Sequence, residues 1–327
     1  MEKRILGRTG LEVSVLGMGG LFVSRVGGRG REEACQAVHR ALELGVNYVD
    51  TAPGYADSEE VLGLALEGVP QPYYLSTKLG GRPQPFDAKD KGALRRSVEE
   101  SLRLLKRDHI DVLMIHEPDR PGQYDWWEDY DNFHGPVADL LEELKAEKII
   151  KFAGLGGTTA YQLPHIMATG SYDVVLTAFN YSLLWREATI AVLPEARRQN
   201  MGVIIGSPLQ QGALARRYSE VETGARWLST PRQEQYKKLY AFLDEMEMPL
   251  PEVALRMVLS NLNISTILTG ARSVEEVEQN VSSIEKGALP ADVLARLQEI
   301  ADMVPFRPFE EPFGLPFGRA YKGPGHA

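Results

Sequence analysis

The stretch VNYVDTAPGYADSEEVLGLALEG (residues 46–68) contains the unit that predicts the fold of the whole chain. It opens with a short apolar run that ends on Asp50, turns at Pro53 and Gly54, and continues from Ser58 with apolar residues at helical spacing. A short run of β-branched and aromatic residues is typical of a buried strand, and serine is a common first residue of a helix. The stretch therefore predicts one strand followed by one helix.

The same alternation recurs on both sides of this stretch. Apolar runs that predict strands lie at 13–19, 46–50, 73–78, 111–116, 151–156, 173–179, 202–208 and 265–270. Amphipathic stretches that predict helices lie at 31–45, 58–68, 91–108, 135–148, 187–200, 251–261 and 273–284. Strict alternation is typical of a parallel sheet, and eight such units close into a (β/α)8 barrel, or TIM barrel, of class α/β. An open doubly wound sheet would need a G-x-G-x-x-G pattern, which GMGGLFVSRVGG (17–28) does not match.

The two ends of the chain differ from this pattern. Residues 4–17 alternate around GRTG (7–10), which predicts an N-terminal β-hairpin. The stretch 305–327 is rich in Pro, Gly and Phe and predicts an irregular tail. Because no change of composition suggests a linker, we expect residues 1–327 to form a single barrel domain.

Composition excludes several classes of partner. A formal net charge of −9 disfavours binding to nucleic acid or to an anionic membrane. Cys35 is the single cysteine, so no disulfide within the chain is expected. No apolar stretch approaches the roughly 20 residues that a membrane-spanning helix needs, and the expected location is the cytoplasm.

Four titratable residues follow neighbouring predicted strands. Asp50, Lys78 and His116 stand at the ends of strands two, three and four, and Tyr55 lies in the loop after strand two. Each alone has an ordinary explanation in turn formation, packing or a solvated strand end. In a barrel, however, the carboxyl ends of the strands meet at one mouth, where active sites lie. The four residues are therefore candidate catalytic residues.

Together these residue types suit the reduction of a carbonyl group. A tyrosine with an ordinary pKa near ~10 is a poor acid at neutral pH, and a nearby ammonium favours its ionised form. Asp50 would keep Lys78 charged, while His116 would hydrogen-bond the substrate oxygen. A metal site made from His109, Asp111, His116 and Glu117 is the alternative, but these residues lack the spacing of known metal motifs, and no metal is expected.

Asp50, Tyr55, Lys78 and His116, in this order, resemble the catalytic tetrad of the aldo-keto reductases. The resemblance covers almost the whole chain, in the stretches LGRTGLEVSVLGMGG (6–20), GVNYVDTAPGYADSEEVLG (45–63), LSTK (75–78), SLRLLKRDHIDVLMIH (101–116), GSPLQQGAL (206–214) and GARSVEEVEQN (270–280). It implies a barrel capped by the N-terminal hairpin, a nicotinamide cofactor across the barrel mouth, and tyrosine as the acid. The closest likeness is to the branch of L-galactose and related aldose dehydrogenases.

The same resemblance implies a set of cofactor contacts. Matching positions are Gly20, Leu21, Asp50, Ser207, Pro208, Leu209, Gly270, Arg272, Ser273 and Asn280. This chain departs from the family at the nicotinamide end, where Gly156 and Gly157 replace Ser-Asn and Thr177 replaces glutamine, and these three residues are expected to contact the cofactor in their place. It also departs at Glu276, where a carboxylate would repel the 2′-phosphate of NADP, although Arg272 would attract it. The balance favours NAD over NADP as the cofactor.

The loop 117–136 carries several aromatic residues among acids, including Trp126 and Trp127. We expect both indoles to bind substrate together with Tyr55 and His116, because sugars stack on aromatic rings. The alternative is that these aromatic residues pack the loop onto the barrel or form a contact between subunits. The stretch 216–229 is a second candidate wall, and the acidic loop favours a neutral polyol or hemiacetal.

Three classes of function follow from these observations. The first is an NAD(P)-dependent oxidoreductase acting on a sugar or related polyhydroxy compound, with a general NADPH-dependent aldehyde or ketone reductase as its alternative. The second is a nicotinamide-binding regulatory subunit with little turnover, a use that the same fold also serves. The third is an unrelated barrel enzyme such as a metal-dependent hydrolase. The four candidate catalytic residues favour the first.

Overall fold

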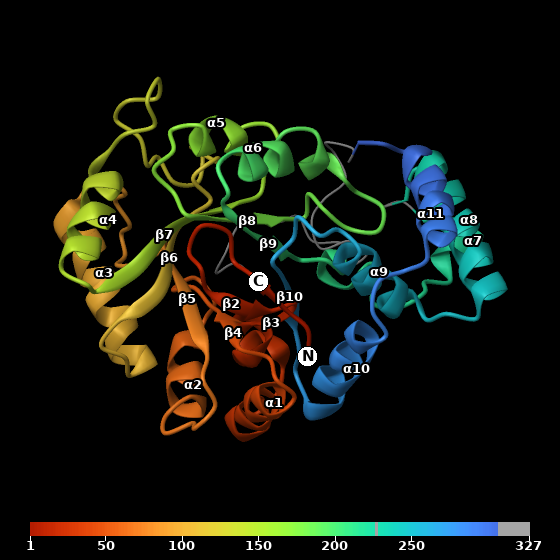
Figure 1. Cartoon of the computed structure of the whole chain (residues 1–327), viewed down its shortest axis with the longest axis horizontal. Coiled ribbons are helices and arrows are strands. Elements are labelled where there is room, and N and C mark those ends of the chain that lie inside the picture. The colour runs from red at the N-terminus through yellow and green to blue at the C-terminus, as the bar shows by residue number, and fades with distance from the viewer. Residues whose placement is uncertain (226–227, 307–327) are drawn as a thin grey trace.

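The computed structural model describes residues 1–225 and 228–306. Within these residues eight parallel strands form a closed barrel in the order β10-β3-β4-β5-β6-β7-β8-β9 (Figure 1). The strands are β3 (Leu16–Gly19), β4 (Tyr48–Asp50), β5 (Tyr74–Leu79), β6 (Ile110–His116), β7 (Ile150–Gly157), β8 (Val174–Ala178), β9 (Gly202–Gly206) and β10 (Thr266–Gly270). The barrel predicted from the alternating pattern is confirmed. The predicted tail at 305–327 lies almost wholly outside the described residues.

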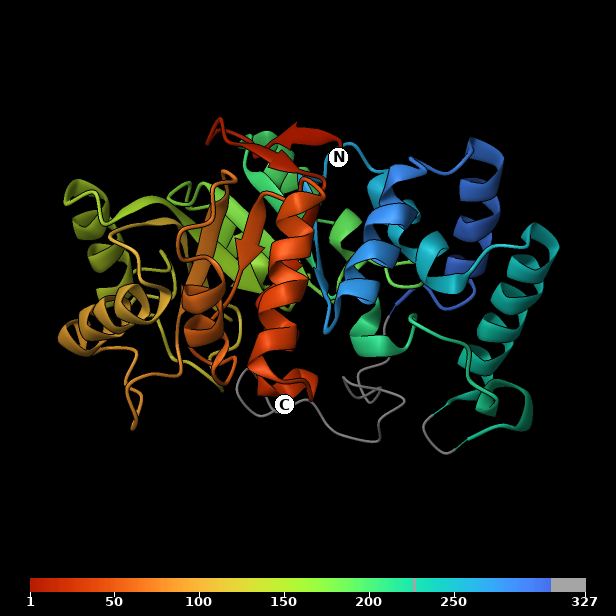
Figure 2. The same ribbon diagram turned by 90° about the horizontal axis from the view of Figure 1, so that it is seen from below.

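The N-terminal hairpin closes one end of the barrel (Figure 2). Strands β1 (Lys3–Ile5) and β2 (Glu12–Ser14) pair antiparallel, and Leu6 and Val13 are fully buried against the side chains inside the barrel. The prediction of one strand over 13–19 was wrong at its start, because the chain bends after β2. The Ser14 hydroxyl donates to the Leu16 carbonyl at 2.6 Å and accepts from the Asn47 backbone N–H at 2.9 Å, which fixes this bend.

Helices cover the outside of the barrel (Figure 1). They are α1 (Arg31–Glu43), α2 (Ser58–Ala65), α3 (Lys91–Leu105), α4 (Pro136–Ala146), α5 (Leu163–Met167), α6 (Val192–Arg198), α7 (Glu220–Thr223), α8 (Thr230–Met246), α9 (Leu250–Leu259), α10 (Val274–Glu285) and α11 (Ala291–Asp302). The sequence pattern did not predict α5, α7, α8 or α11. Helices α8 and α11 lie side by side at one edge of the molecule (Figure 1). No helix in the described part of the chain is both long and apolar enough to cross a membrane.

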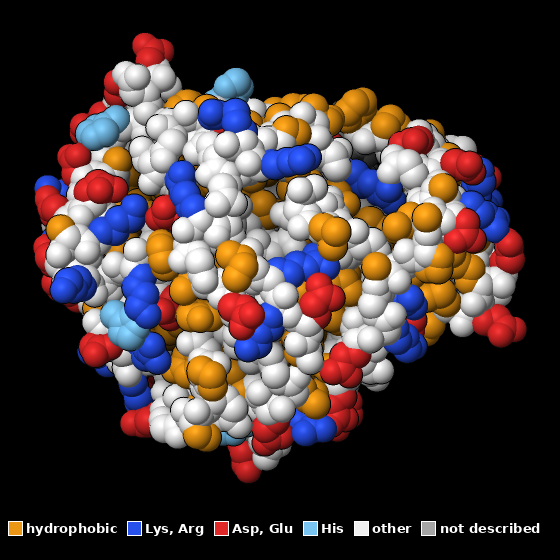
Figure 3. All heavy atoms as spheres, viewed as in Figure 1, with side chains coloured by type: hydrophobic (Ala, Val, Ile, Leu, Met, Phe, Trp, Pro, Cys, Tyr) orange, Lys and Arg blue, Asp and Glu red, His pale blue; other side chains and the backbone are white. Residues whose placement is uncertain are grey.

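Charged side chains are interspersed over the face seen in Figure 3. Many form exposed ion pairs between neighbouring helices, such as that of Arg95 on α3 with Glu147, the residue directly after α4, at 2.7 Å. Exposed pairs of this kind stabilise a protein by about 0–1 kcal/mol each. The large apolar core between the barrel wall and the helices therefore supplies most of the stability.

The direction of side chains in the strands decides what faces the barrel interior. Tyr48, Val112 and Met114 belong to the cluster inside the barrel. Since alternate residues of a strand point to the same face, Asp50 on β4 and His116 on β6 also point inward, at the carboxyl ends of their strands. Lys78 on β5 points inward for the same reason, because Tyr74 packs against this cluster.

Candidate active site

Three adjacent strands bring the predicted catalytic residues together. Strand β4 ends at Asp50, β5 carries Lys78 one residue before its end, and β6 ends at His116. The parallel register places Asp50 beside Ser76 and Lys78 beside Met114. Neighbouring strands of a barrel are about 4.8 Å apart, so these side chains converge at one side of the mouth.

Asp50 and Lys78 form a buried ion pair. The Lys78 ammonium donates to Asp50 Oδ2 at 2.6 Å and to the Thr51 carbonyl at 2.8 Å, and each residue is 2% exposed. Burial alone would lower the pKa of Lys78, but the Asp50 carboxylate outweighs it and, together with Tyr55, raises that pKa. Lys78 is therefore a fixed positive charge at neutral pH.

Ser76 completes the surroundings of Asp50, although sequence analysis did not single it out. Its buried hydroxyl donates to Asp50 Oδ1 at 2.7 Å, so both carboxylate oxygens of Asp50 are bound from β5. The signal was present in LSTK, because Ser76 lies two residues before Lys78 and therefore on the same face of the strand.

Tyr55 is placed by the short loop between β4 and α2. Its backbone N–H donates to the Ala52 carbonyl at 3.0 Å, and its carbonyl accepts from the Ser58 N–H at 2.9 Å. The Ser58 hydroxyl donates to the Gly20 carbonyl at 2.8 Å, which ties this loop to the one after β3. A Cβ at Gly20 would lie 2.7 Å from the Asp50 carbonyl, so only glycine fits there.

The half-buried Tyr55 ring lies between Lys78 and His116. The Lys78 ammonium is 4.9 Å from the centroid of the phenol ring, and the imidazole of His116 meets the ring edge-on with centroids 5.8 Å apart. Burial raises the pKa of Tyr55 above its ordinary value, and the positive charge of Lys78 opposes this rise. The phenol is therefore protonated at neutral pH, as a proton donor must be.

His116 is buried and electrically neutral at physiological pH. Burial, together with the nearby charge of Lys78, lowers the pKa of His116 well below its ordinary value. Its Nδ1 has no hydrogen-bond partner among the described residues. A neutral imidazole beside a phenol can donate or accept a hydrogen bond with a substrate oxygen without adding charge.

The predicted residues at the nicotinamide end do not all face the mouth. A Cβ at Gly156 would make ordinary 3.6 Å contacts with Lys78, whereas one at Gly157 would lie 2.7 Å from Leu163 and 2.9 Å from Asp119. Gly156 therefore faces the barrel interior and Gly157 faces outward. The fully buried Thr177 also lies on the outward face of β8, because its neighbour Leu176 points inward, and its hydroxyl accepts from Asn180 Nδ2 at 3.0 Å. The register thus turns Gly157 and Thr177 away from the barrel interior, and the cofactor contacts expected of Gly156, Gly157 and Thr177 stay predictions.

Other predicted cofactor positions lie in loops at the same mouth. Ser207, Pro208 and Leu209 follow β9, and Ser207 has a positive φ of 53°. Leu21 lies in the 3-10 turn after β3. Gly270 ends β10, and the Phe22 ring covers it so closely that a Cβ would lie 2.3 Å from the ring.

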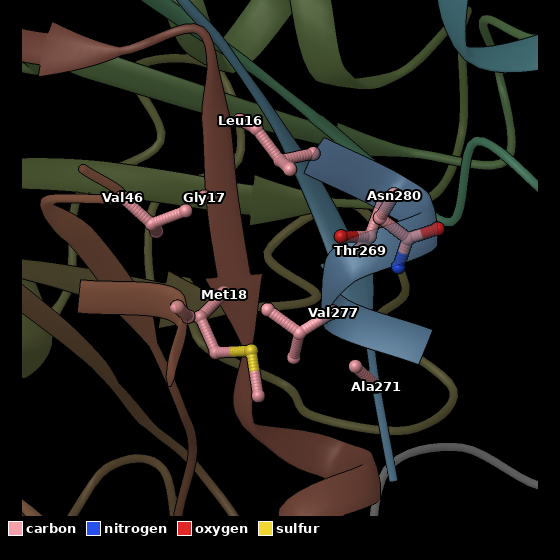
Figure 4. A pocket seen from close by; sticks show the side chains of 9 residues that line it. Leu16, Gly17, Met18, Val46, Thr269, Ala271, Val277 and Asn280 are labelled. Atoms are coloured by element: carbon pink, nitrogen blue, oxygen red, sulfur yellow. The ribbon is translucent and has the colours of Figure 1, made fainter. Parts of the chain in front are cut away.

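The start of α10 holds a close ion pair. Arg272 Nε donates to Glu276 Oε1 at 2.9 Å, and the Arg272 backbone N–H donates to Glu276 Oε2 at 2.8 Å. The hydroxyl of Ser273 caps the helix. Asn280, further along α10, lines a small apolar crevice between this helix, α1 and the barrel wall, beside Thr269 (Figure 4). The two residues that sequence analysis weighed against each other, Arg272 and Glu276, are thus bound to each other.

Two buried polar atoms at this mouth are available to hydrogen-bond a bound cofactor or substrate. His116 Nδ1 and Gln210 Oε1 lack a hydrogen-bond partner among the described residues. Gln210 follows β9, and its amide nitrogen donates to the Phe179 carbonyl after β8 at 3.3 Å. Because buried polar atoms are almost always satisfied, unpartnered ones at strand ends fit a cofactor or substrate that completes them. Residues 1–225 and 228–306 hold no group of three or more His, Cys, Asp or Glu side chains arranged for a metal ion.

The aromatic loop between β6 and α4 is folded differently from the expectation. Trp126 and Trp127 are 0% and 1% exposed, and their indole N–H groups donate to the carbonyls of His116 and Pro118 at 3.0 Å each. Neither ring offers a face to a substrate, so the expectation that they bind it was wrong and the packing alternative applies. The physical reason is that an indole joins a large apolar surface to one donor, which a buried carbonyl satisfies.

Tyr124 is the loop aromatic that reaches the candidate site. It is half-buried and packs edge-to-face on Phe86, with centroids 5.0 Å apart. A Cβ at Gly81 would lie 3.2 Å from the Tyr124 hydroxyl and 4.0 Å from Gly54 Cα, next to the Tyr55 loop. Of the second predicted wall, 216–229, residues 226 and 227 lie outside the described residues.

Known proteins resemble this chain in sequence and in fold. The model of the aldo/keto reductase family matches residues 15–302. L-Galactose dehydrogenase of Arabidopsis thaliana is 29% identical over 320 residues, which cover 93% of this chain and 95% of that protein. NADH-specific methylglyoxal reductase of Escherichia coli (strain K12) is 28% identical over 338 residues, which cover 92% and 99% of the two proteins. The structure of aldo-keto reductase AKR11C1 from Bacillus halodurans (holo form) superposes with a TM-score of 0.76 at 26% identity, covering 94% of this chain and 98% of that one.

Proposed function

The chain belongs to the aldo/keto reductase family of oxidoreductases, whose members use NADH or NADPH, and on this basis we propose that it is an NAD(P)-dependent dehydrogenase of a sugar or related polyhydroxy compound. The observation that carries the proposal is the arrangement of Lys78, which is bound to Asp50 at 2.6 Å while its ammonium lies 4.9 Å from the Tyr55 ring. A phenol next to a fixed cation at a barrel mouth is suited to exchange a proton with an oxygen.

In this mechanism Tyr55 is the general acid and base. During reduction the Tyr55 hydroxyl gives its proton to the carbonyl oxygen, and during oxidation the phenolate takes the proton of the alcohol. The nicotinamide, when bound, supplies or accepts the hydride. Lys78 stabilises the phenolate that forms, because its charge is retained by Asp50. His116 orients the substrate oxygen as a neutral hydrogen-bonding group.

Two observations support a neutral polyhydroxy substrate. The L-galactose dehydrogenase similarity extends over nearly the full length of both chains. At the mouth, Tyr124 adds a half-buried phenol beside the loop of Tyr55, and aromatic rings of this kind bind the C–H face of a sugar while their hydroxyl accepts a hydrogen bond. We therefore assign to Tyr124 the substrate contact that sequence analysis had given to Trp126 and Trp127.

NAD is the cofactor that the start of α10 favours. Glu276 holds the Arg272 guanidinium, so this arginine is not free to pair with a 2′-phosphate, and the carboxylate repels one. The similarity to an NADH-specific methylglyoxal reductase agrees with this preference. In the proposed site, the adenosine end of the cofactor lies at Arg272, Ser273 and Glu276.

Replacing Tyr55 with phenylalanine tests the function. The Y55F variant keeps the aromatic ring and loses the proton, so turnover with NAD⁺ and a panel of neutral aldoses should fall about 10²- to 10⁴-fold while the Kd for NADH is unchanged. Wild-type protein that binds NADH but turns over no member of the panel would favour the regulatory subunit instead. Simple aromatic aldehydes as the best substrates, with no gain from hydroxyl groups, would favour the general reductase.

A further inference from the structure

Within residues 1–225 and 228–306 the imidazole of His116 has no hydrogen-bond partner at Nδ1, so its position depends on its own main chain and on packing. His116 is the last residue of β6, and the next residue, Glu117, has a positive φ of 47°. A residue other than glycine adopts this backbone conformation only where the surroundings enforce it. The end of β6 is therefore held in place by contacts outside the strand.

The peptide unit between His116 and Glu117 is bound on both sides. Its N–H, from Glu117, donates to the Gly156 carbonyl on β7 at 2.7 Å. Its carbonyl, from His116, accepts the indole N–H of Trp126 at 3.0 Å. The second bond comes from the loop between β6 and α4, which returns so that Trp126 meets the last residue of β6.

Packing adds a second constraint on the same residue. A Cβ at Gly80 would lie 3.1 Å from His116 Cβ and 3.4 Å from Trp126 Cζ2. His116 and Trp126 thus both lie close to one face of Gly80, which has a φ of 135°, and His116 in turn meets the Tyr55 ring edge-on. A larger residue at position 80 would press on both side chains, so glycine is needed beside the hydrogen bond between Trp126 and His116.

We propose that Trp126 is a positioning residue, whose indole N–H holds the His116 carbonyl and thereby fixes the imidazole against Tyr55. The proposal rests on the function proposed above, in that His116 orients the substrate oxygen. It gives the long loop after β6 a role in catalysis through the main chain of His116. Trp126 itself touches neither substrate nor cofactor, because it is 0% exposed.

Trp127 provides a matched control. It is also buried, lies in the same loop, and donates its indole N–H to a main-chain carbonyl at the same distance of 3.0 Å. Its acceptor is Pro118, which is not a site residue. Trp126→Phe and Trp127→Phe therefore remove the same donor from the same environment, and only the first releases His116.

The test uses two measurements on the full chain. The kcat should fall about tenfold or more in W126F, with the KM for cofactor unchanged, because small displacements of a group that orients substrate are costly in rate. In W127F it should stay within about twofold of wild type. In the cofactor-free protein, the imidazole C–H resonance of His116, assigned by comparison with H116Q, should shift in W126F and stay in place in W127F.

Equal effects of W126F and W127F on both measurements would overturn the proposal, since the two indoles would then serve only to pack the loop. If W126F fails to fold, site-specific incorporation of benzothienylalanine keeps the bicyclic shape, removes only the N–H, and gives the same two measurements at positions 126 and 127. Wild-type protein with no turnover would refute the proposed function, and the resonance of His116 would still decide the role of Trp126.

Discussion

The ion pair between Arg272 and Glu276 makes cofactor preference the sharpest prediction for this protein. Replacing Glu276 with glutamine removes the carboxylate charge but keeps an oxygen that can accept from the Arg272 backbone N–H, now bonded at 2.8 Å. The loop before α10 should therefore keep its shape. Arg272, which is 50% exposed, becomes free to meet a phosphate.

The expected magnitude follows from the exposure of the pair. A hydrogen bond between a guanidinium and a phosphate stabilises a complex by about 1.5–3 kcal/mol, and exposure and salt reduce this towards the lower figure. Because each 1.4 kcal/mol corresponds to a factor of ten, the Kd for NADPH should fall by about tenfold in E276Q. The Kd for NADH should rise by a few-fold or less, because one neutral acceptor replaces a charged one.

Tryptophan fluorescence quenching measures both constants, at low salt and at about 0.5 M salt, where screening should reduce the gain for NADPH. The control is E278Q. Glu278 lies on α10 like Glu276, and its Oε1 accepts from Arg40 Nε of α1 at 2.8 Å, so this variant breaks an exposed ion pair that does not involve Arg272. An E276Q protein with unchanged affinity for NADPH, or a gain that E278Q reproduces, would refute the reasoning. Wild-type protein that already binds NADPH more tightly would refute the preference for NAD.

Three further predictions concern the barrel itself. Because burial raises the pKa of Tyr55 and the acid must be protonated, the rate of reduction in a stopped-flow pH profile should stay level through neutral pH and fall only above about pH 10. In K78M, which lacks the positive charge that opposes the rise in the pKa of Tyr55, the fall should begin at still higher pH. A change of rate between about pH 6 and 7 would contradict the neutral state of His116. Ser76→Ala leaves Asp50 Oδ1 without its donor, so the free energy of unfolding in urea should decrease by about 1–3 kcal/mol; a loss below about 0.5 kcal/mol would mean that water replaces the hydroxyl. Gly157→Ala should destabilise the protein by about 1–3 kcal/mol, because its Cβ would lie 2.7 Å from Leu163 and 2.9 Å from Asp119. Gly156→Ala should be nearly neutral in the same assay, because its Cβ would lie 3.6 Å from Lys78. Equal effects of the two variants would refute the directions assigned to the two glycines.

The barrel and the candidate catalytic residues were predictable because each depends on local sequence and on one rule of topology. Strand–helix alternation predicts the parallel sheet, and the carboxyl ends of parallel strands meet at one mouth. Asp50, Lys78 and His116 stand at such ends in the sequence itself, so their proximity followed once the strands had been located. Helices α8 and α11 were missed in a part of the chain where the strand–helix pattern does not require them.

Positions that depend on side-chain direction were not predictable in the same way. Gly156 and Gly157 look equivalent in AGLGG, yet one faces Lys78 and the other Leu163, because a shift of one residue reverses the face of a strand. Thr177 is turned outward for the same reason. Trp126 and Trp127 belong to a loop whose composition suits either a substrate wall or a buried layer, and only the carbonyls of His116 and Pro118 decide between them.

The amino-acid sequence by itself thus determined the barrel, its hairpin, and the group of residues around Tyr55, since periodicity and strand ends are properties of the chain. The tertiary structure alone decided that Glu276 binds Arg272, that both indoles point into the protein, and that Gly157 faces outward from the barrel wall. These three outcomes depend on which groups become neighbours after folding, because a charge, an indole N–H or a missing Cβ acquires its role from the atom that it meets.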